Sequence, residues 1–510
     1  MIQVEIERLI AFGLTKGLIE QPDQIPVRNA LLDLLCVSEP YAGQVTCGEE
    51  TAGPMLERIL DYSAETGLLP QNSMGYRDAL GARIMGLLTP RQSEVVKGFF
   101  AACQISPALA TDWFYQLSRA ANYIQVDRVR QNICWAGETA YGNLEITINV
   151  SKPEKDPRDI IAAKHLPQTS YPKCLLCPEN AGFAGTLTHP ARQNHRIIPL
   201  TLHGDPWYFQ YSPYVYYNEH CIVLDQIHRP MKIEEATFWR LFDFLDQFPH
   251  YFIGSNADLP IVGGSLLSHD HFQGGRHVFP MEKAGPYRLF THRDFQTLTV
   301  SLVKWPMSVI RIAGAQKAPL VALAMHILEG WRGYSHPAAQ ILSHSGSTPH
   351  NTVTPIARKN REGLYELDMV LRNNRTTEAH PLGLFHPHES LHHIKKENIG
   401  LIEVMGLAVL PGRLRETFGE IKEMLQSRKP FHPRPFEDPA HPLHKHLDWI
   451  VYLLRQYGTE NSAFDADCIL KQETAMVFQQ VLADAGVFKD TELGRGQFAS
   501  CMKALGFLEL

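Results

Sequence analysis

One stretch, residues 263–277, constrains this chain more than any other, because it sets nitrogen-bearing side chains at alternate positions within a frame of glycines. Alternate residues of an extended strand share one face, so we expect His269, His271 and Gln273 to point the same way. Such a row suits a phosphorus centre: one imidazole can attack, the carboxamide can hold phosphoryl oxygens, and glycines let the backbone approach a ligand. Because the chain has 24 histidines, a His-x-His pair also arises by chance, and the prediction depends on partners elsewhere.

The composition is that of an ordinary globular protein and excludes several classes. The net charge is 48 − 54 = −6 over 510 residues, so no nucleic-acid partner is expected. The apolar run Leu9 to Leu14 is too short for a signal-peptide core, and no run approaches the roughly 18 residues that a membrane helix needs. Nine cysteines, mostly scattered singly, favour a reducing compartment. We therefore expect a cytoplasmic protein without a membrane anchor.

Hydrophobic periodicity divides the chain into four predicted regions. The first is helical, the second and third each combine strands with a helix, and the fourth is helical again after a proline-rich segment. The likeness of the two middle regions suggests an internal duplication. The predicted regions are 1–143, 144–290, 291–411 and 412–510. The expected fold class is α+β, with helical N- and C-terminal extensions on two strand-and-helix halves.

Individual elements follow from the same patterns. Strict alternation predicts strands, and the 3.6-residue period predicts helices. Thr89 to Gln92 reads as a helix start, with Thr89 as the cap and Gln92 closing a capping box. The expected strands are 144–150, 298–302, and a hairpin of 351–356 with 364–367. The expected helices are 233–248, 319–331, 446–457 and 475–485.

A Cys-x-x-Cys pair at Cys174 and Cys177 has three interpretations. It is a redox pair, although the flanking prolines do not suit one, or two incidental cysteines, or half of a zinc site that needs two more ligands. His228 and His269 follow downstream at expected strand ends and would complete the zinc site. A metal on His269 would fix the strand that carries His271, which is a structural role and not Lewis-acid catalysis.

Three separated motifs together resemble the galactose-1-phosphate uridylyltransferases, a branch of the histidine-triad superfamily. Cys174-Leu175-Leu176-Cys177-Pro178-Glu179-Asn180, then Gln226-Ile227-His228, then His269-Asp270-His271-Phe272-Gln273 stand in the family's order. The helical N-terminus and the motif Ser-His-Asp-His-Phe-Gln-Gly-Gly at residues 268–275 resemble the second, bacterial class. Asp270 replaces the proline of the first class. The resemblance implies two fused histidine-triad-like halves, each an antiparallel sheet with helices.

The resemblance also implies an activity: transfer of uridylyl from UDP-glucose to galactose 1-phosphate, in the Leloir pathway of galactose metabolism. His271 matches the nucleophile, which forms a covalent uridylyl-histidine in a ping-pong mechanism. Gln273 stands where related hydrolases have a histidine. A sugar phosphate leaves as a stable dianion and needs no such acid, so glutamine suits transfer. Structural zinc on the four Cys and His ligands and a homodimer are further expectations.

Substrate-binding residues are expected on two segments. The first is the loop that leads into the histidine strand. The second resembles the family segment for the hexose and its phosphate, where lysines neutralise charge and a glutamate accepts hydroxyl hydrogen bonds, unless it is only an exposed charged turn. The candidates are Asn256, Gly263, Gly264, Ser265, Lys395, Lys396 and Glu403. Weaker phosphate candidates are Lys152, Lys155 and Arg276.

Two sets of alternatives stay open. His386-Pro387-His388 spells the first-class motif, but Ser390 replaces the glutamine and no glycines frame it. This loop is the nucleophile site itself, a degenerate counterpart of the first half, a second metal site with His380, His392 or His393, or a loop without a role. The rival functions are a histidine-triad nucleotidyltransferase or phosphorylase that uses an adenine dinucleotide, and a non-catalytic nucleotide sensor.

Overall fold

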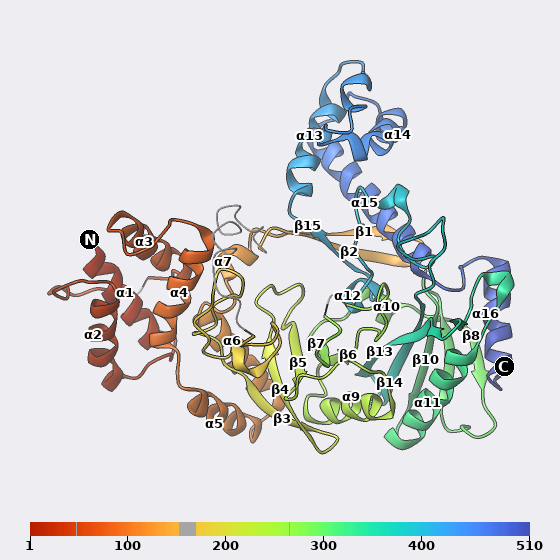
Figure 1. Ribbon diagram of the computed structural model, residues 1–510, viewed down its shortest axis with the longest axis horizontal. Coiled ribbons are helices and arrows are strands. Elements are labelled where there is room, and N and C mark those ends of the chain that lie inside the picture. The colour runs from red at the N-terminus through yellow and green to blue at the C-terminus, as the bar shows by residue number, and fades with distance from the viewer. Residues whose placement is uncertain (47, 152–169, 265) are drawn as a thin grey trace. The chain divides into compact units, whose positions relative to one another are not determined.

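The computed structural model describes residues 1–46, 48–151, 170–264 and 266–510 (Figure 1). The chain divides into two compact units. Unit 1 contains residues 1–131, 151–230 and 268–275, and unit 2 contains residues 132–150, 231–267 and 276–510. Both units combine helices with antiparallel strands, so the expected α+β class is confirmed. The four-region division stays a prediction.

Helices occupy the first part of unit 1, as the periodicity predicted. In the first of them the side chains of Ile6, Leu9 and Ile10 recur on one face and are buried. The helices are α1 Ile2–Thr15, α2 Gln24–Leu34, α3 Ala52–Glu65, α4 Met74–Leu88, α5 Gln92–Cys103, α6 Pro107–Ala120 and α7 Val126–Val129.

The strands of unit 1 run in the order β7-β5-β4-β3, each antiparallel to its neighbour. They are β3 Ile198–Leu202, β4 Asp205–Tyr211, β5 Cys221–Asp225 and β7 His271–Gly275. The register pairs Leu224 with His271 and Ile222 with Gln273. Because side chains alternate along a strand, His271 and Gln273 share one face of this sheet and Phe272 lies on the other.

An aromatic core covers the face that carries Phe272. Its ring stacks on Trp207 with centroids 4.8 Å apart and planes 9° apart. Phe99 of α5 and Phe114 of α6 pack on Phe209 of β4, at centroid distances of 6.2 and 5.7 Å. This packing holds β7 in place on the face of the sheet opposite to His271 and Gln273, so these two side chains project from a well-packed strand.

Unit 2 contains a sheet with the strand order β16-β8-β9-β10-β14-β13-β6. Helices α9 Glu235–Gln247 and α11 Lys317–Gly333 pack on it (Figure 1), and the Phe242 ring of α9 lies 5.3 Å from that of Tyr365. Both helices and the hairpin of β13 with β14 confirm the predicted elements. The strands are β6 Phe252–Gly254, β8 Pro286–Thr291, β9 Thr299–Val303, β10 Val309–Gly314, β13 Asn351–Lys359, β14 Tyr365–Asn373 and β16 Leu508–Glu509.

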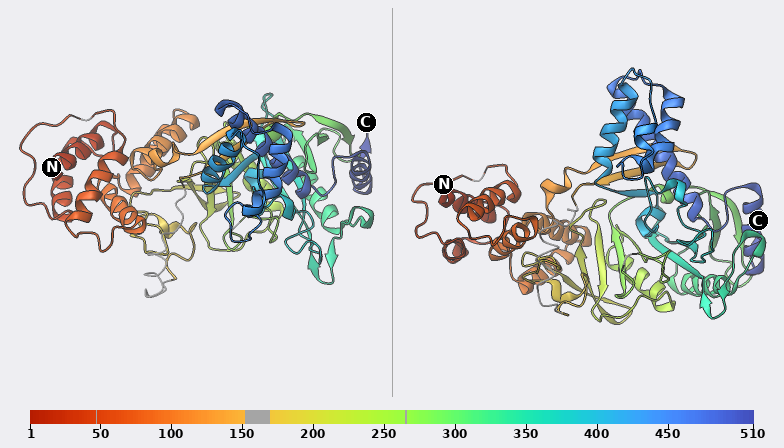
Figure 2. Two further views of the ribbon diagram at one scale, coloured as in Figure 1. Left: turned by 90° about the horizontal axis from the view of Figure 1, so that it is seen from above. Right: turned by 45° about the horizontal axis from the view of Figure 1, so that its top comes forward.

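A second sheet of unit 2 joins β1 Ile133–Thr139, β2 Gly142–Asn149 and β15 Leu407–Pro411. The strand β1 lies in a stretch whose pattern we interpreted as helical. Helix α15 Ala463–Ala485 packs on it, with the Trp135 indole donating to the Lys471 carbonyl at 3.0 Å. Figure 2 shows α15 beside α13 Leu414–Gln426 and α14 Leu447–Tyr457.

The remaining α-helices and strands described in unit 2 are α10 Pro280–Lys283, β11 His344–Ser345, β12 Thr348–Pro349, α12 Leu401–Val404 and α16 Glu492–Ala504. Of the helices that the structure describes, none combines the length with the apolar character that crossing a bilayer demands.

The predicted helix start at Thr89 is wrong. Thr89 ends α4, because its N–H donates to the Met85 carbonyl at 2.9 Å. Helix α5 begins at Gln92, and the Arg91 N–H donates to the Glu94 carboxylate at 2.9 Å. The side chain of Gln92 accepts a hydrogen bond from the Ile197 N–H at 3.2 Å and does not close a capping box.

Candidate functional site

Four sulfur and nitrogen ligand atoms gather in unit 1. Cys174 Sγ lies 3.2 Å from His269 Nδ1, Cys177 Sγ lies 3.2 Å from His228 Nδ1, and the two sulfurs are 3.5 Å apart. All four ligand atoms lie within 4.8 Å of one another. Tetrahedral zinc with bonds of about 2.0–2.3 Å holds such ligands about 3.3–3.8 Å apart, so the cluster fits zinc. The prediction that these four residues meet is confirmed.

The surroundings of the cysteines favour a metal site over a redox pair. Burial acts to raise the pKa of the Cys174 thiol, but the contact with the His269 ring and the hydrogen bond from the Leu176 N–H outweigh burial and lower the pKa, which favours the thiolate that binds a metal. Cys177 leads into a short 3₁₀ helix, Pro178–Asn180, and not into the α-helix N-terminus of a redox motif.

Two further groups hold the ligands in place. The Asn180 amide donates to the carbonyls of Cys174 and Cys177, both at 2.8 Å, and so fixes the turn between the cysteines. His269 Nε2 donates to the Asp225 carbonyl at 2.8 Å, which leaves Nδ1 as the ligand atom. Asn180 was part of the motif, but the pattern alone did not predict which groups its side chain binds.

His271 is the first residue of β7 and is 5% exposed. Its Nδ1–H donates to the His269 carbonyl at 2.8 Å, which leaves the Nε2 lone pair available. Within the described part of the chain, Nε2 makes no hydrogen bond. Burial lowers the pKa of His271 to about 4, so the ring is neutral near pH 7. Since the strand begins at His271, the expected alternation does not extend to His269, whose side chain turns to the cysteines.

Gln273 lies on the same face of β7 as His271. Its Oε1 is 3.2 Å from Nε2 of the buried His220, a residue that we did not predict. Among described residues, the amide nitrogen of Gln273 has no hydrogen-bond partner. An amide donor two residues from a free imidazole nitrogen is the arrangement expected for a phosphoryl group held during attack.

The glycines after Gln273 serve packing within the protein. A Cβ on Gly275, whose φ is +152°, would lie 2.7 Å from the Glu219 carbonyl oxygen. The Tyr217 hydroxyl donates to the Gly274 carbonyl at 3.0 Å. The turn before β5 therefore accounts for Gly275 by packing, and the expectation that the flanking glycines let the backbone approach a ligand stays a prediction.

The predicted loop residues of unit 2 pack on one another. A Cβ on Gly264 would lie 2.6 Å from the Asn256 amide nitrogen, and one on Gly263 would lie 2.5 Å from the Ala257 carbonyl oxygen. The Asn256 carboxamide oxygen accepts from the Leu401 N–H at 2.8 Å, at the start of α12. Ser265, like Lys152 and Lys155, lies outside the described residues.

The predicted hexose-phosphate segment is partly buried. Lys395 Nζ lies 2.9 Å from Glu403 Oε1, and Glu403 Oε2 accepts from the Gly400 N–H at 3.2 Å. Lys396 and the weaker candidate Arg276 are exposed. The pair of Lys395 and Glu403 is more than an exposed charged turn, and its role toward a substrate stays a prediction.

Histidines of the histidine-rich loop, residues 382–393, bind the backbone of the loop and the side chain of Asn398. His386 Nε2 lies 3.2 Å from the Asn398 amide oxygen, and His392 Nε2 donates to the Pro387 carbonyl at 2.9 Å. His393 Nδ1 donates to the Ser390 carbonyl at 2.9 Å. Within the ranges that the structure describes, no second group of three or more metal ligands gathers, so the second metal site is not supported.

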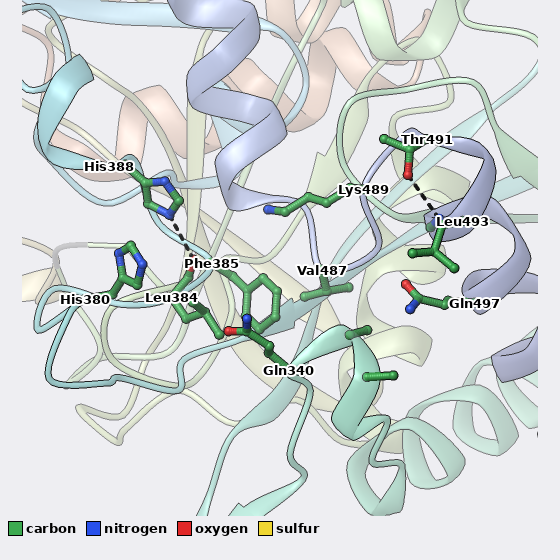
Figure 3. Close-up of a pocket in the computed structure, with 13 residues that line it drawn as sticks. Gln340, His380, Leu384, Phe385, His388, Val487, Lys489, Thr491, Leu493 and Gln497 are labelled. Atoms are coloured by element: carbon green, nitrogen blue, oxygen red, sulfur yellow. Dashed lines mark hydrogen bonds between the residues drawn. The ribbon is translucent and has the colours of Figure 1, made fainter.

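A pocket of about 360 Å³ lies in unit 2 beside this loop (Figure 3). It is lined by apolar side chains such as Phe385 and by polar ones that include His380, His388 and Lys489. Lys489 Nζ donates at 2.9 Å to three carbonyls at the end of α15, those of Ala483, Asp484 and Gly486. Its three N–H bonds are therefore used within the protein, and none of the residues predicted for substrate binding, for catalysis or for the zinc site of unit 1 lines the pocket.

Comparison with known proteins points to one family. Residues 32–230 match the family described as galactose-1-phosphate uridyl transferase, N-terminal domain, and residues 244–448 match its C-terminal domain. Proteins named galactose-1-phosphate uridylyltransferase are 57% identical in Caldanaerobacter subterraneus subsp. tengcongensis, over 99% of this chain and 98% of that protein, and 49% identical in Bacillus subtilis, over 98% and 97%.

Among solved structures, the yeast Ap4A phosphorylase Apa2 matches with a TM-score of 0.29 and 11% identity, over 58% of this chain and 84% of that chain. That likeness is too distant to inform the fold or the activity. The two family matches together cover well over half of the chain, and the relatives match it almost end to end. The chain therefore belongs to the galactose-1-phosphate uridylyltransferase family.

Proposed function

We propose that this protein transfers the uridylyl group of UDP-glucose to galactose 1-phosphate, with His271 as the covalent nucleophile. The names of relatives that are 49–57% identical over nearly the whole chain support the activity. The observation that carries the assignment of His271 is its hydrogen bond to the His269 carbonyl, because it places the ring proton on Nδ1 and leaves Nε2 unprotonated.

The chemistry then needs no external base. Nε2 of His271 attacks the α-phosphorus, and the bond to the leaving oxygen breaks with its electron pair going to glucose 1-phosphate. The ring becomes a phosphorylated imidazolium that keeps its Nδ1 proton, and the His269 carbonyl stabilises that positive charge. A phosphate oxygen of galactose 1-phosphate attacks the same phosphorus, the N–P bond breaks, and the neutral imidazole returns.

Gln273 supplies a donor without supplying an acid. Its amide nitrogen can donate to a phosphoryl oxygen while charge develops there, and it has no proton that titrates near neutral pH. The leaving group is a sugar phosphate that departs as an anion, so transfer requires no protonation at this position. These properties favour exchange between sugar phosphates over hydrolysis.

The four-ligand cluster fits zinc, which we propose as a structural ion held by Cys174, Cys177, His228 and His269. When bound, it would supply a rigid anchor for His269. The His269 carbonyl accepts a hydrogen bond from His271. The orientation of the nucleophile His271 therefore depends on the backbone of a metal-binding residue.

The remaining expectations are extensions of the same proposal. Lys395, Lys396 and Glu403 would serve the hexose phosphate, with Glu403 held in place by its contacts to Lys395 and Gly400. The substrates are charged metabolites of the cell interior, so we keep the cytoplasm as the proposed compartment. A homodimer is expected from the resemblance alone.

Labelling with UDP-glucose that carries radioactive phosphorus at the α-position tests the proposal. An acid-labile, base-stable phosphoramidate should form on His271, and galactose 1-phosphate should discharge it. His271→Ala should abolish labelling, whereas His388→Ala should leave it largely intact, because the His388 side chain contacts Leu384, His380 and Asp484 and none of the residues proposed for catalysis in the described part of the chain. Label from an adenine dinucleotide instead would favour the phosphorylase, and binding without any label would favour the nucleotide sensor.

A further inference from the structure

His220 is a buried residue that the proposed mechanism does not yet use. It lies just before β5 and is 3% exposed. The register pairs Cys221 with Gly274, so His220 is a diagonal neighbour of Gln273 on the face that carries His271. Its Nε2 lies 3.2 Å from Gln273 Oε1, and its buried Nδ1 has no hydrogen-bond partner among the residues that the structure describes.

The proton of the imidazole can be assigned from these contacts. An amide oxygen only accepts, so His220 Nε2 must carry the proton and Nδ1 the lone pair. With the amide turned the other way, His220 would have to bury an unpaired N–H at Nδ1, which is rarer in proteins than a buried unpaired acceptor. The same rotation would turn the carboxamide oxygen of Gln273 toward an anionic phosphoryl group. Both effects disfavour the rotated amide.

We propose that His220 is a positioning residue, which holds the Gln273 carboxamide with its NH₂ group directed to the nucleotide phosphate on the His271 side of β7. This inference rests on the proposed function of Gln273 as a phosphoryl donor. His220 does not touch the substrate in this role. It determines that the NH₂ group of the Gln273 carboxamide, and not its oxygen, faces the phosphate.

The turn that carries His220 is built to hold it. Val215 and Glu219 have positive φ values of 42° and 52°, a conformation that non-glycine residues adopt only when their surroundings impose it. The His220 carbonyl accepts from the Ser212 N–H at 2.8 Å, and its ring lies 4.5 Å from the ring of Tyr217. These contacts hold the His220 ring in one orientation. His220 can therefore orient the side chain of Gln273 on the neighbouring strand.

The test is a comparison of His220→Phe with His220→Gln in the full-length protein. Phenylalanine keeps the ring volume and removes the donor, whereas the glutamine amide can place an N–H near the former Nε2 position. We expect His220→Phe to lower the rate of His271 labelling about tenfold to a hundredfold, with little change in the nucleotide KM. His220→Gln should recover most of that rate.

A double-mutant cycle separates positioning from a general structural role. In a Gln273→Ala background, His220→Phe should cost nothing further, because its effect passes through the missing amide. The inference is overturned if His220→Phe labels like the wild type, or if its cost persists in that background.

The rate of His271 labelling is measured with any nucleotide that labels the residue. The inference about His220 and the proposed substrate are therefore tested independently. Label from an adenine nucleotide alone would reject the proposed substrate, and the same cycle would still judge His220. No label from any nucleotide would overturn both.

Discussion

At the scale of single residues, His269 links the cysteine cluster to the nucleophile through two different atoms. Its ring nitrogen lies 3.2 Å from Cys174 Sγ, while its carbonyl accepts from His271 Nδ1 at 2.8 Å. A movement of the His269 backbone would therefore alter the hydrogen bond that fixes the tautomer of His271. Whatever stabilises the turn of the cysteines stabilises the nucleophile as well.

Asn180 provides a test at this scale. It bonds the carbonyls of both cysteines, so Asn180→Ala should weaken zinc retention about tenfold to a hundredfold, as removal of supporting groups around metal ligands does elsewhere. Competition with a zinc chelator, followed by elemental analysis, measures the effect. Purified wild-type protein should hold about one zinc per chain, because four ligands fill the tetrahedral coordination of one zinc ion.

Asn194→Ala is the matched control, since Asn194 is equally buried and donates at 2.8 Å to the Ala121 carbonyl in the same unit, away from the cysteines. It should lower stability and leave zinc retention unchanged. Wild-type protein with less than about a tenth of an equivalent of zinc would contradict the four-ligand site.

The metal ligands could be predicted from the sequence, whereas the residues that hold the ligands and Gln273 in place could not. Cys174, Cys177 and His269 lie in short patterns whose spacing indicates a ligand set. The contact of His220 with Gln273 depends on the register of two strands that are distant in sequence, and local patterns do not encode that register. The role of Asn180 depends on the conformation of the turn that it closes.

At the scale of elements, the same limit explains the wrong helix start. Thr89, Pro90 and Gln92 fit a capping pattern, but α4 extends to Leu88 and Arg196 Nε donates to the Pro90 carbonyl at 2.7 Å. A tertiary contact thus decides where α5 begins. Helices α9 and α11 were predicted correctly because their apolar stripes pack on a sheet, and burial of such a stripe is visible in the period of the sequence.

Helix α5 offers a matched pair of substitutions. Phe99 is fully buried against Phe114 and Phe209, while the adjacent Phe100 is 40% exposed. Phe99→Ala should lower the free energy of unfolding by about 3–5 kcal/mol, because it removes a buried ring and leaves a cavity behind the sheet of unit 1. Phe100→Ala should cost about 1 kcal/mol or less, since its ring is partly in water already. Urea denaturation measures both, and equal costs would show that α5 does not cover that sheet.

At the scale of the whole molecule, both units keep buried histidines neutral. Burial lowers the pKa of His195 to about 3 and of His220 to about 4 in unit 1, and of His393 to about 4 and of His446 to about 3 in unit 2. In the unfolded chain these rings titrate near 6.5, so between that value and about 4 the unfolded state binds more protons. Stability must therefore fall as the pH falls through this window, and it is greatest above it.

His446 isolates one part of this dependence. It is 0% exposed, neither ring nitrogen has a hydrogen-bond partner in the described ranges, and its ring lies 5.6 Å from that of His393. At pH 5 its protonation in the unfolded chain should cost about 2 kcal/mol of stability, from 1.5 pH units at 1.36 kcal/mol each. His446→Phe should remove that part, so the loss of stability between pH 7 and pH 5 becomes smaller than in the wild type.

Urea midpoints at pH 7 and pH 5 measure the difference, and His432→Phe is the control, because His432 is exposed and its substitution should leave the pH dependence unchanged. Stability that is equal at the two pH values in the wild type would mean that the buried rings are already protonated or reach solvent. An unchanged pH dependence in His446→Phe would assign the effect to the other histidines. The expected result instead places part of the acid sensitivity in the contact between the histidine loop and the segment that leads into α14, where Lys445 and Arg413 add positive charge beside the ring and oppose its protonation.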